Sequence, residues 1–554
     1  MPRQRAGADA VLEQPLAVDD HRRVAFGLDD EARALGREVA YQGGDHVLEH
    51  LARRLDEELR LQVLGERHVE EGVEHGVSLD DSARAACARS HAFVAGLADG
   101  EALVYGLTTG CGPLASARID AAQRERFQRN LVRSHAATLG APHPAAWVRA
   151  AMLVRVEVLA QGCSGVAPHL LDTFLGMLAA GITPVVRAIG GVGASGDLGE
   201  LAQIALAGLG EGEVDVHGAG RAAAAALGDA GLTPVAPTLR EGLALVNGTS
   251  FHTAVAALQC ARFARLATAA ECAAALAFEA LRGHVETLDP ALHAARPHPG
   301  QTAVAARLRA RLAGSRLVRS VDPAATDQDP YSLRCTAQIV GAARDVADAA
   351  ARTVTIELAA VTDNPLFLAA QGRVLHGGNF HGQPVAMALD QLKLAAVELG
   401  VLAERRLARL LDPVRNRGLP PFLVRGTPGL QSGLMGLQYG ATAMAAENAV
   451  LAAPASVRSL PTNADNQDVV PMGMVAARQT AQVLDNVARI VAIELLAAAQ
   501  ALELRGLADA APGMRTVHAA VRGVSAPLDD DRPLADDVEA LVALVDAEPA
   551  RFAD

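Results

Sequence analysis

The sequence Gly190-Gly191-Val192-Gly193-Ala194-Ser195-Gly196-Asp197-Leu198 is the stretch around which the chain is organised. Ala194, Ser195 and Gly196 are three small residues in a row, followed by an acid that can cap a helix. Glycine tolerates strained dihedral angles and close approach, so the Gly196 nitrogen can attack the Ala194 carbonyl. Loss of water from that ring and from the Ser195 hydroxyl would leave a methylidene conjugated to an imidazolone. The stretch therefore predicts a built-in electrophile.

The same letters have two other interpretations. Residues 191–196 match G-x-G-x-x-G, a dinucleotide-binding pattern, and an apolar run from Ile182 to Val186 precedes them. Asp215 follows at about the spacing, roughly 20 residues, of an acid that contacts a ribose. A glycine-rich turn before a helix is the third and commonest explanation. The rest of the chain has to decide between them.

Composition excludes several classes of protein. The 554 residues carry a net charge of −13, which gives no electrostatic support for nucleic-acid binding. Six scattered cysteines without C-x-x-C spacing indicate a reducing compartment, and no residue spacing calls for a metal. The N-terminus lacks an apolar signal core, and even the most apolar helical runs carry charges. We therefore expect a soluble, cytoplasmic protein with no membrane partner.

Long alanine-rich runs without proline dominate the second half of the chain and predict helices. They cover Phe251 to Val285, Ala342 to Leu358, Ala386 to Leu411, Leu434 to Ala453 and Ala476 to Leu504. Five such runs do not fit the alternation of strands and helices in a dinucleotide fold. We predict a mainly α fold, a long parallel and antiparallel helix bundle, with a loop-rich part before it. Bundles of this size commonly close by oligomerising.

Short polar motifs occur in a fixed order on either side of the central stretch. Aromatic residues make up only 3% of the chain, yet Tyr105, Tyr331 and Tyr439 all lie in these motifs. The segments are Tyr105–Gly112 (YGLTTGCG), Gln128–Ala136 (QRNLVRSHA), Glu241–Ser250 (EGLALVNGTS), Gln328–Cys335 (QDPYSLRC), Gly378–Gln383 (GNFHGQ), Gln438–Tyr439, Glu447–Asn448 and Asn466–Asp468 (NQD). Taken singly, each has an ordinary structural explanation, such as a turn, a packed aromatic or a surface ion pair.

Taken together, the motifs resemble the aromatic amino-acid ammonia-lyases and aminomutases, whose pattern at the centre is G-x-G-A-S-G-D-L. The resemblance extends from about residue 79 to the end of the chain. It implies that Ala194, Ser195 and Gly196 form a 4-methylideneimidazole-5-one (MIO) ring, with no external cofactor. It also implies a homotetramer in which each active site draws on more than one chain.

The resemblance assigns roles to individual residues. Tyr105 is implied as the base, although its ordinary pKa of about 10 needs nearby positive charge to lower it. Arg334 is expected to hold the substrate carboxylate through a bidentate fork. The other implied catalytic residues are Asn247, Tyr331, Phe380 and Glu447, and the other implied substrate contacts are His135, Gln328, Tyr439 and Gln467, with Asn247 in both groups.

The chain departs from the family pattern at several positions. Cys111 replaces a usual aromatic, Glu200 a usual proline and Gln203 a usual histidine, and we expect local repacking there without loss of the ring. The motifs also divide the chain: we predict a variable N-terminal extension at 1–75, the loop-rich part at 76–245, the bundle at 246–510 and a C-terminal tail at 511–554.

The expected reaction is deamination of L-tyrosine to trans-p-coumarate and ammonia. Two hydrogen-bonding groups, His135 and Tyr439, suit a para-hydroxyl, and Gly382-Gln383 is the form found in enzymes acting on phenylalanine or tyrosine. Histidine deamination to urocanate is the nearest alternative, because Ser134-His135 is also the pair of the histidine enzymes. Tyrosine 2,3-aminomutase is the third, and a dinucleotide dehydrogenase or a non-catalytic scaffold are hypotheses of other classes.

Overall fold

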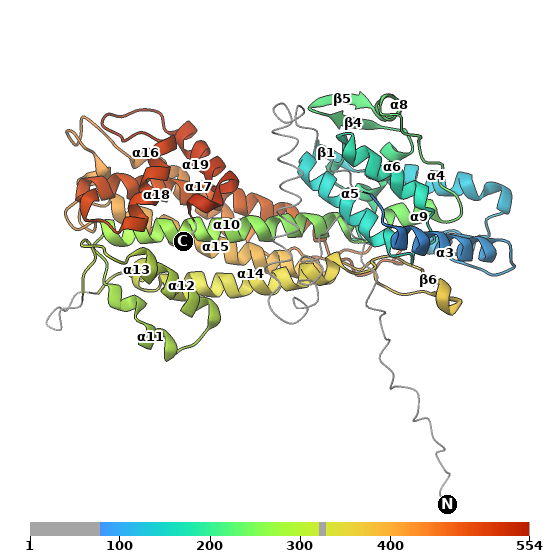
Figure 1. Cartoon of the computed structure of the whole chain (residues 1–554), viewed down its shortest axis with the longest axis horizontal. Helices are drawn as coiled ribbons and strands as arrows, with labels where there is room; N and C mark the ends of the chain where they lie inside the picture. Colours follow the sequence, from blue (N-terminus) through green and yellow to red (C-terminus); the bar gives the residue numbers. More distant parts are fainter. Residues whose placement is uncertain (1–77, 321–327, 553–554) are drawn as a thin grey trace, which may run out of the picture.

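Long helices form where the sequence has uninterrupted alanine-rich runs, as predicted. The computed structural model describes residues 78–320 and 328–552, so the extension expected at 1–75 lies outside the described residues. Figure 1 shows the long helices running along the length of the molecule. They are α10 (Ser250–Ala280), α14 (Thr336–Leu358), α15 (Gln383–Leu411), α16 (Met435–Leu451) and α17 (Gly473–Arg505). With 31 residues, α10 is about 45 Å long.

Three of these helices begin at the same place. A Cβ atom on Gly382, directly before α15, would lie 2.3 Å from His252 Nε2 in the first turn of α10. A Cβ atom on Gly473, the first residue of α17, would lie 3.0 Å from the same ring. The last turn of α14 meets this point from the other direction, because the Thr249 hydroxyl donates to Glu357 Oε1 (2.6 Å). The N-termini of α10, α15 and α17, with their positive partial charge, therefore gather at one end of the bundle.

Buried ion pairs join the helices along their length. Arg406 of α15 makes a bidentate pair with Glu494 of α17, and both side chains are buried. Glu271 of α10 accepts hydrogen bonds from Arg307 (2.7 and 2.9 Å) and from Arg344 of α14 (2.6 Å). Removing one partner of such a pair leaves an uncompensated buried charge, which is strongly destabilising. These pairs fix the register of the helices.

The part of the chain before the bundle consists of shorter helices and small antiparallel sheets. The helices are α3 (Asp81–Ala98), α4 (Arg124–His135), α5 (Ala145–Ala160), α6 (Pro168–Ala179), α7 (Leu198–Gly208), α8 (Ala223–Asp229) and α9 (Glu241–Val246). The strands are β1 (Leu139–Pro142), β2 (Ile182–Pro184), β3 (Arg187–Ile189), β4 (Glu213–Val216) and β5 (Ala219–Ala222). β1 pairs with β3, and β2, β4 and β5 form a second sheet in that order.

This arrangement does not support the dinucleotide hypothesis. Every pairing between the described strands is antiparallel, whereas a dinucleotide fold needs a parallel sheet. Asp215 lies on β4, where its carboxylate accepts the Gly218 N–H (2.9 Å) in the turn to β5. The residue expected to contact a ribose is therefore part of a hairpin.

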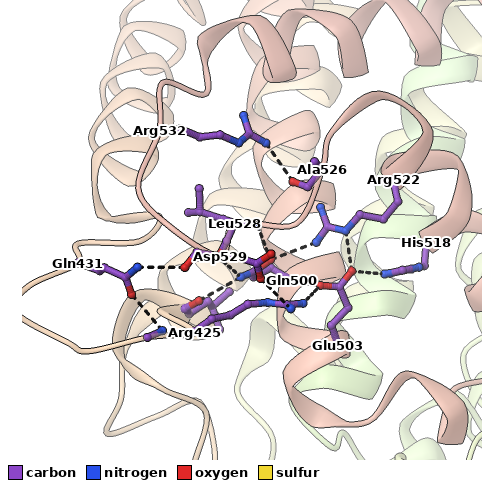
Figure 2. A network of polar contacts seen from close by, with 12 residues as sticks. Arg425, Gln431, Gln500, Glu503, His518, Arg522, Ala526, Leu528, Asp529 and Arg532 are labelled. Atoms are coloured by element: carbon purple, nitrogen blue, oxygen red, sulfur yellow. Dashed lines mark hydrogen bonds and ion pairs between the residues drawn. The ribbon is translucent and has the colours of Figure 1, made fainter.

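The segment predicted as a C-terminal tail is folded onto the bundle. It contains α18 (Pro512–Val524) and α19 (Ala535–Ala547). Figure 2 shows how Glu503 of α17 holds it: the carboxylate accepts hydrogen bonds from His518 Nε2 (2.7 Å) and Arg522 Nε (2.6 Å) and pairs with Arg425. Because Arg425 lies in the loop before α16, these contacts tie α16 to the end of the chain.

Short elements complete the described chain. They are α11 (Pro290–Ala294), α12 (Pro299–Arg311), α13 (Tyr331–Arg334), the antiparallel pair β6 (Leu366–Leu368) and β7 (Arg373–Leu375), and 3₁₀ turns at Gly112–Leu114, Ala121–Gln123, Val285–Leu288, Ala369–Gln371, Pro421–Leu423, Leu507–Asp509 and Pro549–Arg551. Within residues 78–320 and 328–552, no helix has the length and apolar character required to cross a bilayer.

Candidate active site

The central stretch forms a tight turn that lies against a second glycine loop. Gly193 O accepts the Gly196 N–H (3.2 Å), which places Ala194 and Ser195 at the corners of the turn. Ser195 has a φ of 53°, a left-handed conformation that is strained for a residue with a side chain. A Cβ atom on Gly196 would lie 2.0 Å from Gly248 O, so only glycine fits at 196. A small, bent and tightly enclosed tripeptide fits the MIO ring that the resemblance implies.

Asp197 anchors this turn to the bundle. It stands at the N-cap position of α7, as expected, but its side chain makes no capping hydrogen bond there. Its carboxylate instead accepts the backbone N–H groups of Phe251 (2.8 Å) and His252 (2.9 Å) in the first turn of α10, and His252 Nδ1–H (2.7 Å). Burial acts to lower the pKa of His252, but the Asp197 carboxylate outweighs burial and the pKa is raised. The acid thus joins the starts of two helices.

Tyr105 lies in the same cavity as the turn. Its hydroxyl oxygen accepts the Gly112 N–H (2.7 Å), which closes the loop predicted to carry the base. Burial raises the pKa of Tyr105, the neighbouring Cys111 thiol adds to this effect, and the Gly112 N–H opposes it. The lowering of the pKa that the base role calls for is therefore not supplied by the described residues of a single chain.

His135 is held in one tautomer. Its Nδ1 lies 2.8 Å from Leu131 O and 3.1 Å from Ser134 Oγ. A carbonyl oxygen only accepts, so Nδ1 must carry the proton and donate it. In the neutral ring Nε2 is then an acceptor. His135 therefore suits a ligand that brings an O–H or N–H group.

Asn247 is oriented by a buried acid. Its Nδ2 donates to Asp363 Oδ1 (2.8 Å) and to Asn364 O (3.1 Å), which uses both amide hydrogens. The Arg240 guanidinium donates to both oxygens of the same carboxylate, at 2.7 and 3.1 Å. The Arg240 and Asp363 side chains are fully buried. Asn247 is left with its Oδ1 as an acceptor, which suits an N–H group of a ligand.

A cavity of about 980 Å³ brings many of the predicted residues together. Its lining includes Tyr105, His135, Ala194, Ser195, Asn247, Phe380 and Gln467, and Gly196 lies at the next position of the turn. Gln467 touches the turn directly, because its Nε2 donates to Ser195 Oγ (3.3 Å). Residues from across more than 350 positions of sequence therefore meet in one place.

The other predicted site residues do not line this cavity. They are Gln328, Tyr331, Arg334, Tyr439 and Glu447. Figure 1 shows α13 and α16, which carry four of the five, at the opposite end of the molecule from α4 and α9. Tyr331 is 68% exposed and Tyr439 is 67% exposed. The Arg334 guanidinium stacks on the Tyr331 ring at 4.7 Å, and Glu447 Oε2 accepts a hydrogen bond from Asn486 (2.7 Å).

Sequence reasoning missed the residues that support the site. Asp363, which orients Asn247, is held by Arg240 from 123 positions away, and His252 is 55 positions from Asp197. Nothing in the local sequence indicates such pairs. The one available signal is that Asp363 directly precedes the motif-like Asn364-Pro365, and Arg240 directly precedes the segment that begins at Glu241.

Known proteins resemble this chain over most of its length. The family model described as aromatic amino acid lyase matches residues 66–523. A histidine ammonia-lyase of Anaeromyxobacter sp. (strain K) is 47% identical over 479 residues, which is 85% of this chain and 94% of the relative. One of Gloeobacter violaceus is 45% identical over 457 residues, 82% of this chain and 89% of the relative.

Solved structures share the fold. The structure of a tyrosine aminomutase from Streptomyces globisporus has a TM-score of 0.82 and 38% identity, and covers 86% of this chain and 94% of that one. The structure of a histidine ammonia-lyase from Trypanosoma cruzi has a TM-score of 0.79 and 36% identity, with 89% and 95% covered.

Glu200, one of the departures noted above, is buried in the first turn of α7. A Cβ atom on Gly191 would lie 2.2 Å from its Oε1, so the carboxyl group packs directly against the central stretch. Among the described residues, neither carboxyl oxygen makes a hydrogen bond of ordinary geometry. Burial, reinforced by the Asp197 carboxylate, raises the pKa of Glu200 from 4.5 to about 8. Glu200 is therefore uncharged at neutral pH.

This leads to a prediction about stability and pH. The pKa of Glu200 is higher in the folded chain than in the unfolded one, so the protonated carboxyl group favours the folded state at low pH. That contribution is lost as the pH rises from 4.5 to about 8. The loss amounts to about 4 kcal/mol in the free energy of unfolding. Glu200→Gln, which cannot ionise, should flatten the fall in melting temperature between pH 5 and 8. Exposed Glu125→Gln is the control. Parallel curves for wild type and Glu200→Gln would contradict the prediction.

Proposed function

Because the chain belongs to the aromatic amino acid lyase family, we propose that it deaminates L-tyrosine to trans-p-coumarate and ammonia. The observation that carries this proposal is the cavity in which Tyr105, His135 and Asn247 surround the Ala194-Ser195-Gly196 turn. The His135 Nε2 lone pair matches the phenolic O–H of tyrosine, and phenylalanine would leave it unpaired. Gln383, the residue that the resemblance associates with phenylalanine or tyrosine, begins α15.

Histidine ammonia-lyase is the second candidate. The relatives reported above that are 45% and 47% identical carry this name. An imidazole N–H would also satisfy the His135 lone pair, so this contact excludes neither substrate. Tyrosine 2,3-aminomutase is the third candidate, favoured by the similar structure from Streptomyces globisporus.

In the proposed reaction, Ala194, Ser195 and Gly196 would supply, as the MIO ring, an electrophile for the substrate amine, which would make the amine a better leaving group. The Tyr105 hydroxyl oxygen, as phenolate, accepts the β-proton. The electrons of that C–H bond form the new double bond, and those of the C–N bond leave with the nitrogen. The Gly112 N–H stabilises the ionised form of Tyr105 through its 2.7 Å hydrogen bond. Arg334 lies outside this cavity, so in the oligomer proposed next it is Arg334 of a neighbouring chain that would bind the carboxylate and keep the β-carbon near Tyr105.

We also propose that the remaining residues of each site come from neighbouring chains of a homotetramer. Tyr331 and Tyr439 are exposed aromatic side chains at the other end of the molecule, where they are free to enter a neighbour's cavity. On α15, Met387, Leu394 and Val401 are exposed by 49%, 45% and 40% and follow at intervals of seven residues. An apolar stripe at this spacing is typical of a helix that packs against another helix.

The central test follows product formation from each amino acid. Purified protein incubated separately with L-tyrosine, L-histidine and L-phenylalanine should release a conjugated acid fastest from tyrosine, measured by ultraviolet absorption, with chromatography to detect a β-amino acid. Ser195→Ala cannot form the methylidene and should be inactive on all three. A faster reaction with histidine would replace the first candidate by the second. Absence of any product from the wild type would overturn the lyase assignment.

The tautomer of His135 generates a specificity prediction. His135→Leu removes the acceptor, so the ratio of kcat/KM for tyrosine to that for phenylalanine should fall by about tenfold to a hundredfold. The control is Arg133, which is exposed on the same helix and pairs with Glu211 away from the cavity. Arg133→Gln should therefore leave the ratio unchanged. An unchanged ratio in His135→Leu would show that His135 does not meet the substrate ring.

Site sharing is tested by co-expressing two inactive variants. In a shared site, Tyr105 and Tyr331 come from different chains, so a Tyr105→Phe chain and a Tyr331→Phe chain can together form an intact site. Random mixing should restore roughly a quarter of the sites. Tyr105→Phe mixed with Ser195→Ala is the matched control, because both residues line one cavity of the same chain and no intact site can form. Differently tagged chains allow the mixed oligomers to be purified. Equal activity in the two mixtures would argue against sharing.

A further inference from the structure

The loop from Thr462 to Gln467 presents an amide to the Ser195 hydroxyl. Gln467 Nε2 donates to Ser195 Oγ (3.3 Å), and Gln467 Oε1 accepts from Thr462 Oγ1 (2.9 Å). The Thr462 hydroxyl therefore holds the amide so that its NH₂ group faces Ser195. Among the described residues, no other side chain donates to this hydroxyl oxygen.

The loop is braced so that this contact is preorganised. Thr462 N donates to Gln467 O (3.0 Å), and Gln467 N donates to Thr462 O (3.4 Å). The three residues Asn463, Ala464 and Asp465 between them all have left-handed φ angles, of 56°, 52° and 60°. Such conformations persist only when the surrounding structure holds them.

The loop is also attached to the central stretch itself. The Met472 N–H donates to Val192 O (3.0 Å), and Pro471 fills the space where a Cβ atom on Gly193 would lie. At its other end, the Val470 N–H is held by Ser459 Oγ (2.8 Å). These contacts, made just after Gln467 in the chain, hold Gln467 close to Ser195.

Formation of the ring needs help at this oxygen. The Gly196 nitrogen bonds to the Ala194 carbonyl carbon, and the carbonyl oxygen departs as the first water with the N–H protons of Gly196 and Ser195, which leaves a double bond between that carbon and the Ser195 nitrogen. Ser195 then loses its Cα proton and its hydroxyl group as the second water, which leaves the methylidene. The Ser195 oxygen gains negative charge as its bond to carbon breaks, and a preorganised donor stabilises such charge.

We propose that Gln467 is a catalytic residue for ring formation, donating to the hydroxyl that leaves Ser195, and that Thr462 is the positioning residue that orients it. The proposal rests on the proposed function, because it concerns the making of the same electrophile. It gives Gln467 a role before any substrate binds, distinct from the substrate contact expected from the sequence.

The experiment measures the intact mass of freshly purified full-length chains over time after synthesis. Wild type should lose two waters. Gln467→Glu keeps the shape but replaces the donor by an acceptor, and should slow the loss about a hundredfold or more, leaving chains that have lost one water or none. Thr462→Val frees the amide without removing it and should slow the loss less, about tenfold. Gln371→Glu, which changes an exposed residue that does not line the cavity, is the control and should match wild type.

The outcomes separate the two proposals. Circular dichroism and size-exclusion chromatography identify any variant that fails to fold, in which case Thr462→Val decides the matter. Full loss of two waters at the wild-type rate in both variants would overturn the role of Gln467, and a raised KM alongside it would assign Gln467 to substrate binding. Wild-type chains that keep their full mass would overturn the proposed function itself.

Discussion

A short length of backbone pairing holds the candidate site together. Gly248 N donates to Ser195 O (3.1 Å), and Asp197 N donates to Gly248 O (2.8 Å), so the two glycine-rich loops are locked face to face. The Asp197 carboxylate extends this lock to the first turn of α10. The strained angle at Ser195 persists because these contacts outweigh it. The long bundle then serves as a rigid support for a turn that could not hold its shape alone.

Hydrogen bonds to residues behind the cavity wall set which atoms the cavity offers to a ligand. Asn247 donates its amide hydrogens to Asp363, which Arg240 holds, and to Asn364 O. Leu131 O accepts from His135 and so keeps the imidazole proton on Nδ1. Both residues consequently present acceptors. Under the proposed function, these two acceptors would face the amine and the far end of the substrate and select for N–H and O–H groups there. Specificity would then depend on the residues that orient Asn247 and His135.

The sequence predicted the helices well, because alanine-rich runs such as that of α10 have a strong intrinsic preference and no breakers. Through the resemblance it also singled out residues that line one cavity with Ser195, namely Tyr105, His135, Asn247, Phe380 and Gln467, together with five that lie outside that cavity. It did not predict the partners of Asp197 or the acid behind Asn247, because those contacts join positions far apart in the chain and leave no periodic pattern. The direction of the pKa shift at Tyr105 was missed for the same reason: burial depends on packing.

The rigidity of the bundle has a geometric consequence. The cavity lies at one end of helices about 45 Å long, and Tyr331 and Tyr439 lie toward the other, so no bending of a loop can unite them within one molecule. Under the proposed sharing, two such molecules would complete each other in antiparallel alignment across a two-fold axis, where each contributes its distal end to its neighbour's cavity and receives the same in return. Under the proposed sharing, dilution below the dissociation constant would silence every copy at once, although each retained its electrophile.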